Sequence, residues 1–185
     1  MTKHPEGDDA GLMLRVARGD RRAFEELMLK YQRAVVNTAY MYVGNPSVAE
    51  ELAQDVFLRV YRAASRYRPE ARFSTWLFTI VRNVCMNYRT REGRYDRQMD
   101  PETEAVLELQ ENPESEMVKK ERQRKIQEAI QSLPESLRLP LILHQFDHMQ
   151  YEEIAEVLEI SLSAVKVRIY RARQALIKKL KPYLD

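Results

Sequence analysis

The stretch from Gln150 to Leu180 constrains the fold most, because its pattern is typical of two helices joined by a tight turn. Residues 151–158 are expected to form a short first helix, and Glu159 with Ile160 the bend. Ser161 is placed to cap the second helix through its hydroxyl. This second helix carries an apolar stripe at spacings of three and four, formed by Val165, Ile169, Ala172, Leu176 and Leu180. We therefore expect a longer helix braced by a shorter one.

The outer face of the longer helix combines bases with two apolar positions. From Ser161 to Asp185 the sequence has seven bases and one acid, which suits a polyanionic partner. Val167 and Tyr170 occupy a face that solvent alone would fill with charge. Such a helix fits the DNA major groove. The alternative interpretation is a basic amphipathic helix that only covers a core or lies on a membrane surface. The residues expected to contact DNA are Ser163, Lys166, Val167, Arg168, Tyr170, Arg171, Arg173 and Gln174.

The rest of the chain predicts an all-α protein, because only five glycines occur in 185 residues and no long stretch alternates as a strand does. Helices are expected over 12–19, 20–44, 46–65, 74–91 and 119–133, with Asp20, Asn45 and Ser74 as N-caps and Gly44 at the end of the second helix. No apolar run approaches the roughly 20 residues that span a bilayer, and the first residues lack a signal-peptide core. The single cysteine, Cys85, is interpreted as a small buried residue in a reducing cytoplasm, with a redox or metal role as the alternative.

An acidic segment lies between two helical parts of the chain. Residues 96–116 contain eight acids and one base, with two prolines as helix breakers, which predicts a flexible linker. We expect a tail over 1–9, one small helical domain over 10–95, a linker over 96–118 and a second domain over 119–182. A solubilising spacer is the plainer interpretation of the same acids.

A cluster of polar side chains lies on the outer side of the helix expected over 46–65. Glu50, Glu51, Gln54 and Asp55 could form an acid–base or metal site, yet adjacent carboxylates diverge around a helix instead of converging on a pocket. A solvated helix face is the plainer alternative.

The segment 67–95 places an aromatic residue beside amides and bases. Trp76, Thr79, Asn83 and Asn87 fall on one helix face, and five arginines follow between 82 and 97. Aromatic rings stack on unpaired bases, amides read base edges and arginines bind phosphates. The alternative is that Trp76 belongs to the core and the amides are incidental.

Three motifs resemble those of bacterial RNA polymerase sigma factors of the extracytoplasmic-function group. The segment YEEIAEVLEISLSAVKVRIYRARQAL resembles the helix-turn-helix that reads the −35 promoter element. RFSTWLFTIVRNVCMNY resembles the part that opens the promoter at the −10 element, and ELAQDVF resembles the segment that grips the polymerase. The resemblance covers about four-fifths of the chain and excludes the tail and the linker.

The resemblance implies roles for particular residues. It assigns Glu51, Gln54 and Asp55 to the clamp helices of the largest polymerase subunit, and Asn83 to a pocket for an extruded base. It places Trp76 at the edge of the melted region, and the expected −10 set is Trp76, Thr79, Arg82, Asn83, Asn87 and Arg89.

The resemblance also implies a set of partners. They are core RNA polymerase, including the flap of the second largest subunit, promoter DNA and an anti-sigma factor. It further implies a cytoplasmic protein without cofactor, metal or membrane insertion. Such a protein separates DNA strands by selective binding, without bond making.

Some positions depart from the resemblance or suggest other functions. Pro140 falls inside an expected helix and should start or kink it, and His148 stands where glycine is usual. Ser163-Ala164 replaces a common Gly-Thr. His144 and His148 have metal-ligand spacing, but turn residues are the favoured interpretation. The other functions considered are an operator-binding regulator using only residues 119–182, and a nucleic-acid enzyme using Glu50, Glu51 and Asp55.

Overall fold

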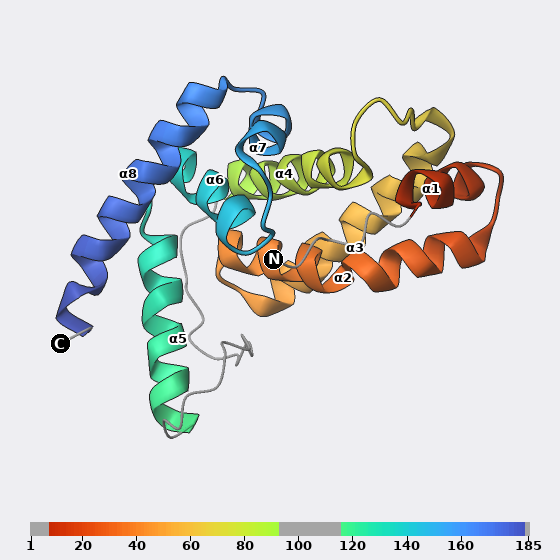
Figure 1. Cartoon of the computed structure of the whole chain (residues 1–185). Helices are drawn as coiled ribbons and strands as arrows, with labels where there is room; N and C mark the ends of the chain where they lie inside the picture. The colour runs from red at the N-terminus through yellow and green to blue at the C-terminus, as the bar shows by residue number, and fades with distance from the viewer. Residues whose placement is uncertain (1–7, 93–115, 184–185) are drawn as a thin grey trace.

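The computed structural model describes residues 8–92 and 116–183, and within these ranges every regular element is a helix. Figure 1 shows the first four α-helices on one side of the molecule and the last four on the other. The bounds are α1 Asp9–Ala17, α2 Arg21–Val43, α3 Pro46–Ala63, η1 Ala64–Arg66, α4 Phe73–Glu92, α5 Glu116–Gln131, α6 Glu135–Gln145, α7 Tyr151–Leu158, α8 Leu162–Leu180 and η2 Lys181–Tyr183. The predicted all-α class is confirmed.

Local capping determines where the long helices begin and end. The Asp20 carboxylate accepts hydrogen bonds from the backbone N–H groups of Arg22 and Ala23 at 3.0 and 3.2 Å, and so caps α2. Gly44 ends the helix with a positive φ of 83°, which costs a glycine little. The Asn45 side chain then caps α3, and Pro46 occupies its first turn. These three boundaries agree with the sequence prediction.

Several other boundaries differ from those predicted. The first helix begins at Asp9 instead of residue 12, because the Asp8 carboxylate accepts from the Gly11 N–H at 3.0 Å. Helix α4 begins at Phe73, one residue before the predicted cap. Helix α5 already includes residues 116–118, which had been assigned to the linker; residues 1–7 and 93–115, with most of the predicted tail and linker, lie outside the described residues. Helix α6 runs through Pro140, so it does not start there.

The first four helices pack around a core of apolar and aromatic side chains. Tyr67 and Phe73 are buried there, and Trp76 is half-buried beside them with its ring centroid 5.0 Å from that of Tyr67. Cys85 is fully buried as predicted, and burial raises the pKa of its thiol to about 12. The thiol therefore stays protonated at neutral pH and contributes only packing.

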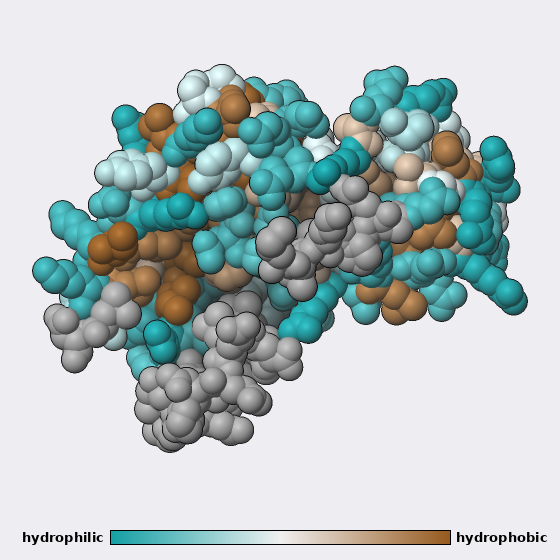
Figure 2. Space-filling model, in the orientation of Figure 1, coloured by the Kyte–Doolittle hydropathy of each residue, from teal (hydrophilic) through white to brown (hydrophobic). Residues whose placement is uncertain are grey.

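The last four helices form the predicted helix-turn-helix and its support. Val165, Ile169 and Ala172 of α8 are buried, while Leu176 and Leu180 are half-buried, so the apolar stripe faces inward along its length. Ile154 and Val157 of α7 and Ile142 of α6 join the same core. Figure 2 shows hydrophilic residues over most of one face, with a hydrophobic patch where α5 and α8 run close together. No helix within the described ranges is long and apolar enough to cross a membrane.

The two helical units pack directly on each other. One continuous apolar cluster includes Leu77 and Val81 of α4 together with Ile154 and Val157 of α7. Polar contacts surround it: the Arg138 guanidinium donates to the Tyr42 carbonyl at 3.0 Å, and Gln127 donates to the Tyr40 carbonyl at 3.1 Å. This arrangement is called the closed arrangement below.

Candidate nucleic-acid interface and polymerase-binding surface

Helix α8 is oriented by its own cap and by a sharp turn. The Ser161 hydroxyl accepts from the Ala164 N–H at 3.2 Å and lies 3.0 Å from the Ser163 hydroxyl. The turn before it requires Glu159 to adopt a left-handed backbone with φ of 55°, a conformation that usually favours glycine. The predicted cap is therefore confirmed, and the Ser163 hydroxyl is already engaged with its neighbour.

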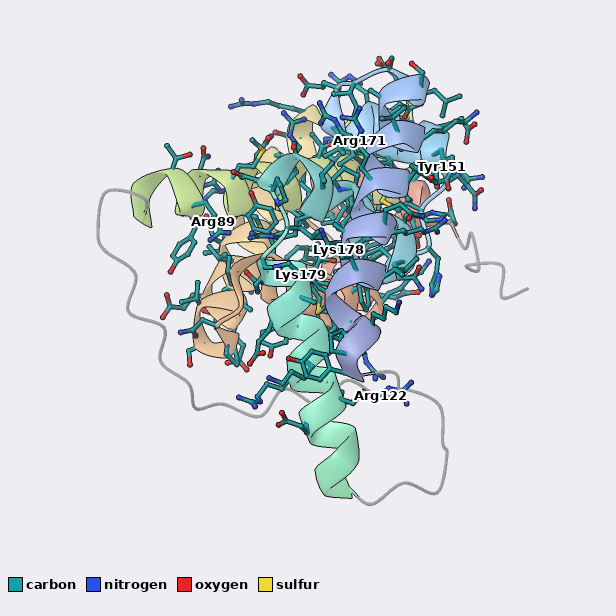
Figure 3. The ribbon with its side chains drawn as sticks, turned by 90° about the vertical axis from the view of Figure 1, so that its left-hand side faces the viewer. Arg89, Arg122, Tyr151, Arg171, Lys178 and Lys179 are labelled. Atoms are coloured by element: carbon teal, nitrogen blue, oxygen red, sulfur yellow. The ribbon has the colours of Figure 1, made fainter. Side chains whose placement is uncertain are left out.

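The outer face of α8 is exposed along its length. Tyr170 is 64% exposed and Val167 is 46% exposed, although both have large apolar surfaces. Lys166, Arg171 and Arg173 are exposed around them, and Figure 3 shows Arg171, Lys178 and Lys179 on this helix. Ser163 and Gln174 are exposed as well, while Arg168 is half-buried. All eight predicted DNA contacts thus lie on one helix, and seven of them are exposed.

The predicted −10 face of α4 divides into exposed and engaged side chains. Asn83 and Asn87 are exposed one turn apart. Trp76 instead packs in the aromatic cluster with Tyr67 and Phe73, so its ring is only partly accessible. The Thr79 hydroxyl donates to the Thr75 carbonyl at 2.9 Å inside the helix.

Two arginines of that face are engaged, Arg82 with the other helical unit and Arg89 within its own. The Arg82 side chain is 16% exposed, and it donates to the Val157 carbonyl at 2.6 Å and to the Glu159 carboxylate at 2.9 Å. A cation at the C-terminal end of α7 is favourable, because the helix dipole is negative there. The Arg89 guanidinium lies 5.8 Å from the Tyr42 ring centroid. In the closed arrangement Arg82 is therefore not free to meet a phosphate.

The predicted polymerase contacts lie together on α3. Glu51 and Gln54 are exposed, and Asp55 is half-exposed with an ion pair of 2.9 Å to Arg59 one turn further on. Leu58 on the same helix is 53% exposed. The surface therefore combines acids with one apolar side chain, and the alternative of a convergent carboxylate site has no support in this geometry.

The histidine pair lies where α6 ends: His144 is in the last turn of the helix, and only His148 is in the turn that follows, which is the position predicted for both. His144 Nδ1 lies 3.1 Å from the Met149 carbonyl, and its ring packs against the Tyr151 ring in a tilted arrangement with centroids 4.7 Å apart. His148 is exposed, with a left-handed φ of 53° where the resemblance expected glycine. Among the described residues no cluster of three or more metal-ligating side chains occurs.

Comparison with known proteins identifies the family. Residues 27–95 match sigma-70 region 2, and residues 123–176 match sigma-70 region 4. The chain is 36% identical to the RNA polymerase sigma-H factor of Pseudomonas aeruginosa over 184 residues, covering 95% of each protein. The chain belongs to the extracytoplasmic-function group of the sigma-70 family.

Further relatives agree with this assignment. The sigma factor is 34% identical to the ECF RNA polymerase sigma-E factor of Escherichia coli K12, covering 95% of this chain and 96% of that protein. It is therefore an initiation factor that binds core RNA polymerase and directs it to promoter DNA. The alternative of an operator regulator is not favoured.

Solved structures share the fold. CnrH, solved in complex with the cytosolic domain of CnrY, is 25% identical to this sigma factor, with a TM-score of 0.73 over 94% of this chain and 97% of that chain. The sigma factor RpoE from Bartonella quintana, solved with the anti-sigma factor NepR, is 24% identical, with a TM-score of 0.67 over 85% of this chain and 96% of that chain.

Sequence reasoning missed the residues that join the two units of this sigma factor. Two of the polar contacts between them are the Thr38–Asp147 bond and the bond from Arg138 to the Tyr42 carbonyl, whose partners lie 109 and 96 positions apart in the chain. No local pattern indicates such partners, because helical periodicity predicts only which face turns inward. Buried polar residues on otherwise apolar faces are the one available signal: Thr38 and Arg138 are almost fully buried.

Proposed function

We propose that the two helical units read two separate promoter elements, with α8 at −35 and the exposed face of α4 at −10. The observation that best supports this is the outer face of α8, where exposed Val167 and Tyr170 lie among Lys166, Arg171 and Arg173. Bases bind phosphates and read guanine edges, and apolar groups contact thymine methyls in the major groove. The proposed −35 contacts on α8 also include Ser163, Arg168 and Gln174.

The α4 face opens the −10 element by binding unpaired bases. Exposed Asn83 and Asn87 present amides to base edges, and the accessible edge of Trp76 offers stacking surface. Extruding a base costs a few kilocalories per mole, which contacts in a pocket must offset. Thr79, Arg82 and Arg89 support the displaced backbone once Arg82 is released from α7.

The acidic surface of α3 binds the clamp helices of the largest polymerase subunit through Glu51, Gln54 and Asp55. The exposed acids favour a basic coiled coil, and electrostatic complementarity of this kind sets orientation and on-rate. The second helical unit meets the flap of the second largest subunit. These contacts bring the factor to promoters in the cytoplasm, and it acts there by binding alone, without covalent catalysis.

An anti-sigma factor that holds the closed arrangement is a further proposed partner. The likeness to CnrH supports it, because that chain was solved with a partner bound and its overall arrangement is shared across nearly its whole length.

Run-off transcription with core polymerase, with and without the chain, tests the proposed function. Transcripts that appear only with the chain support it, and failure to bind core polymerase would refute it. Arg171→Ala should weaken binding by different factors for −35 sequences that differ in single bases. Arg173→Ala should weaken binding by a similar factor for all of them. If Arg171→Ala and Arg173→Ala lower the affinity by the same factor for every −35 sequence variant, the assigned outer face of α8 is wrong.

The −10 assignment has its own measurement. Asn83→Ala should leave closed-complex binding intact and reduce strand opening, measured as permanganate reactivity of unpaired thymines. Asn37→Ala is a control with the same chemical change on a different helix, α2, where the asparagine is half-buried. If Asn83→Ala and the unmodified chain give the same permanganate reactivity, Asn83 does not take part in strand opening.

A further inference from the structure

A buried carboxyl lies at the contact between the two helical units. Asp147, in the turn between α6 and α7, is 7% exposed, and its Oδ2 accepts a hydrogen bond of 2.6 Å from the Thr38 hydroxyl of α2. Thr38 itself is fully buried. The two residues are 109 positions apart, so this bond exists only while the two units are packed together.

No opposite charge neutralises this carboxyl in the closed arrangement. Thr38 is the only polar partner that the described part of the chain provides for it, and no ion pair reaches it there. The nearby groups have other partners: Tyr42 bonds Glu135, His144 meets the Met149 carbonyl, and Arg82 bonds Val157 and Glu159. The elements packed around the turn carry other charged and titratable groups, among them Tyr40 and Tyr42 of α2, Arg82 and Arg89 of α4, Glu135, Arg138 and His144 of α6, Tyr151, Glu152, Glu153 and Glu156 of α7, and the adjacent His148.

Burial without a counter-ion disfavours the ionised form. Desolvation raises the pKa of Asp147 from 3.8 to about 8, and the Thr38 hydroxyl lowers it only in part. A carboxyl that leaves this site for water returns to its ordinary pKa. Closing the two units therefore takes up a proton at neutral pH, and opening releases it.

Closure also conflicts with promoter binding. The −35 and −10 elements lie about 25 base pairs apart, or about 85 Å at about 3.4 Å per base pair. A compact chain of this length has a radius of gyration of only about 16 Å. In addition, Arg82 of the −10 set is bound to α7 and to Glu159 at the helix-turn-helix bend. The two units must separate before both elements can be bound.

We propose that Thr38 and Asp147 form a proton-dependent latch, which favours the closed arrangement while the carboxyl is protonated and the open one when it ionises. This inference rests on the proposed function, because it regulates access to the same DNA-binding surfaces. Protonation of the Asp147 carboxyl sets the equilibrium between the two arrangements.

The sign follows from the two protonation states. Below about pH 4 the carboxyl is protonated in both arrangements, and closure has its full stability. As the pH rises from there to about 8, the closed-to-open ratio falls about tenfold per pH unit. Above pH 8 the carboxyl is ionised in both arrangements, and the ratio becomes constant.

The distance between the two units in the free full-length chain tests the latch. Spin labels at Ser65→Cys in η1 and Lys178→Cys in α8 occupy exposed positions on the two units. Buried Cys85 remains unlabelled. Pulsed electron resonance between pH 5.5 and 9 should show a single short distance at the acidic end and a growing long-distance population as the pH rises.

Substitutions separate the latch from general effects of pH. Asp147→Asn keeps an acceptor for Thr38 but cannot ionise, so the closed population should stay constant over the whole range. Thr38→Val removes the hydrogen bond that exists only in the closed arrangement, so closure weakens and the midpoint of opening should move to lower pH. Glu152→Gln removes an exposed acid from α7 and should behave like the unmodified chain.

The latch is overturned if the distance distribution of the unmodified chain does not change with pH, or if Asp147→Asn keeps the same pH dependence. Should Asp147→Asn fail to fold, Thr38→Val decides: a midpoint that stays in place or moves to higher pH overturns the latch. The measurement contains neither DNA nor polymerase. A failure of run-off transcription therefore overturns the proposed function, and a pH-independent distance overturns only the latch.

Discussion

Replacing Arg138 by methionine should uncouple the two helical units. Its guanidinium is 4% exposed and joins the C-terminal ends of two helices. It donates to the Tyr42 carbonyl at the end of α2 at 3.0 Å, and to the Leu133 carbonyl just after α5 at 2.9 Å. It also donates to the Gln131 carbonyl in the last turn of α5. A cation is favourable at both helix ends, because their carbonyls carry the negative end of the dipole.

The size of the effect follows from these bonds. Each buried carbonyl that loses its donor costs about 1–3 kcal/mol, and methionine keeps most of the side-chain volume. Removing the guanidinium also removes its own desolvation cost, which offsets part of the loss. A net loss of about 3 kcal/mol in the free energy of unfolding is expected, since three carbonyls are affected. With an m value of about 2 kcal/mol per M, the urea midpoint falls by about 1.5 M.

Urea denaturation with two probes measures this. Trp76 is the only tryptophan and reports on the first unit through its fluorescence, whereas circular dichroism reports on all helices. The two transitions should coincide in the unmodified chain and separate in Arg138→Met. The matched control is Arg124→Met, whose guanidinium pairs with Glu121 and Glu128 on the surface of α5, where solvent screens the ion pairs and their loss should change stability little.

The reasoning is refuted if Arg138→Met lowers the midpoint no more than Arg124→Met does. Coincident transitions in Arg138→Met together with a large loss of stability would refute only the part that concerns coupling between the units.

Three further predictions concern single positions. His148→Gly should raise the free energy of unfolding by about 0.5–1 kcal/mol, because the exposed histidine has a left-handed backbone that glycine adopts without strain; thermal unfolding measures it. Ser161→Ala should lose the cap on α8 and about 1 kcal/mol, and an unchanged unfolding midpoint would contradict that role. Cys85 should resist iodoacetamide at pH 7.5 and react in urea, detected by mass spectrometry, because burial raises its thiol pKa to about 12.

Local chemistry made much of the fold predictable. Asp20, Asn45 and Ser161 were predicted as caps, and each accepts backbone hydrogen bonds at the start of its helix. The apolar stripe of α8 turns inward as its spacing predicted. These features depend on residues within four positions of each other, so the sequence pattern contains them completely.

The residue roles are less accessible from sequence. Exposure of Asn83, Asn87 and the α8 face agrees with the periodicity, but periodicity did not predict that Arg82 would bond the end of α7. The left-handed turn at His148 was anticipated only as a departure from the expected glycine.

The sequence by itself determined the helices, their caps, the family and the chemistry of the outer faces, because each depends on near neighbours or on motifs. Tertiary structure alone decided that Thr38 meets Asp147 and that Arg138 joins two helix ends. Such contacts join residues about a hundred positions apart, and the free energy of a buried carboxyl depends on which groups packing brings around it. A list of residue types cannot contain that information.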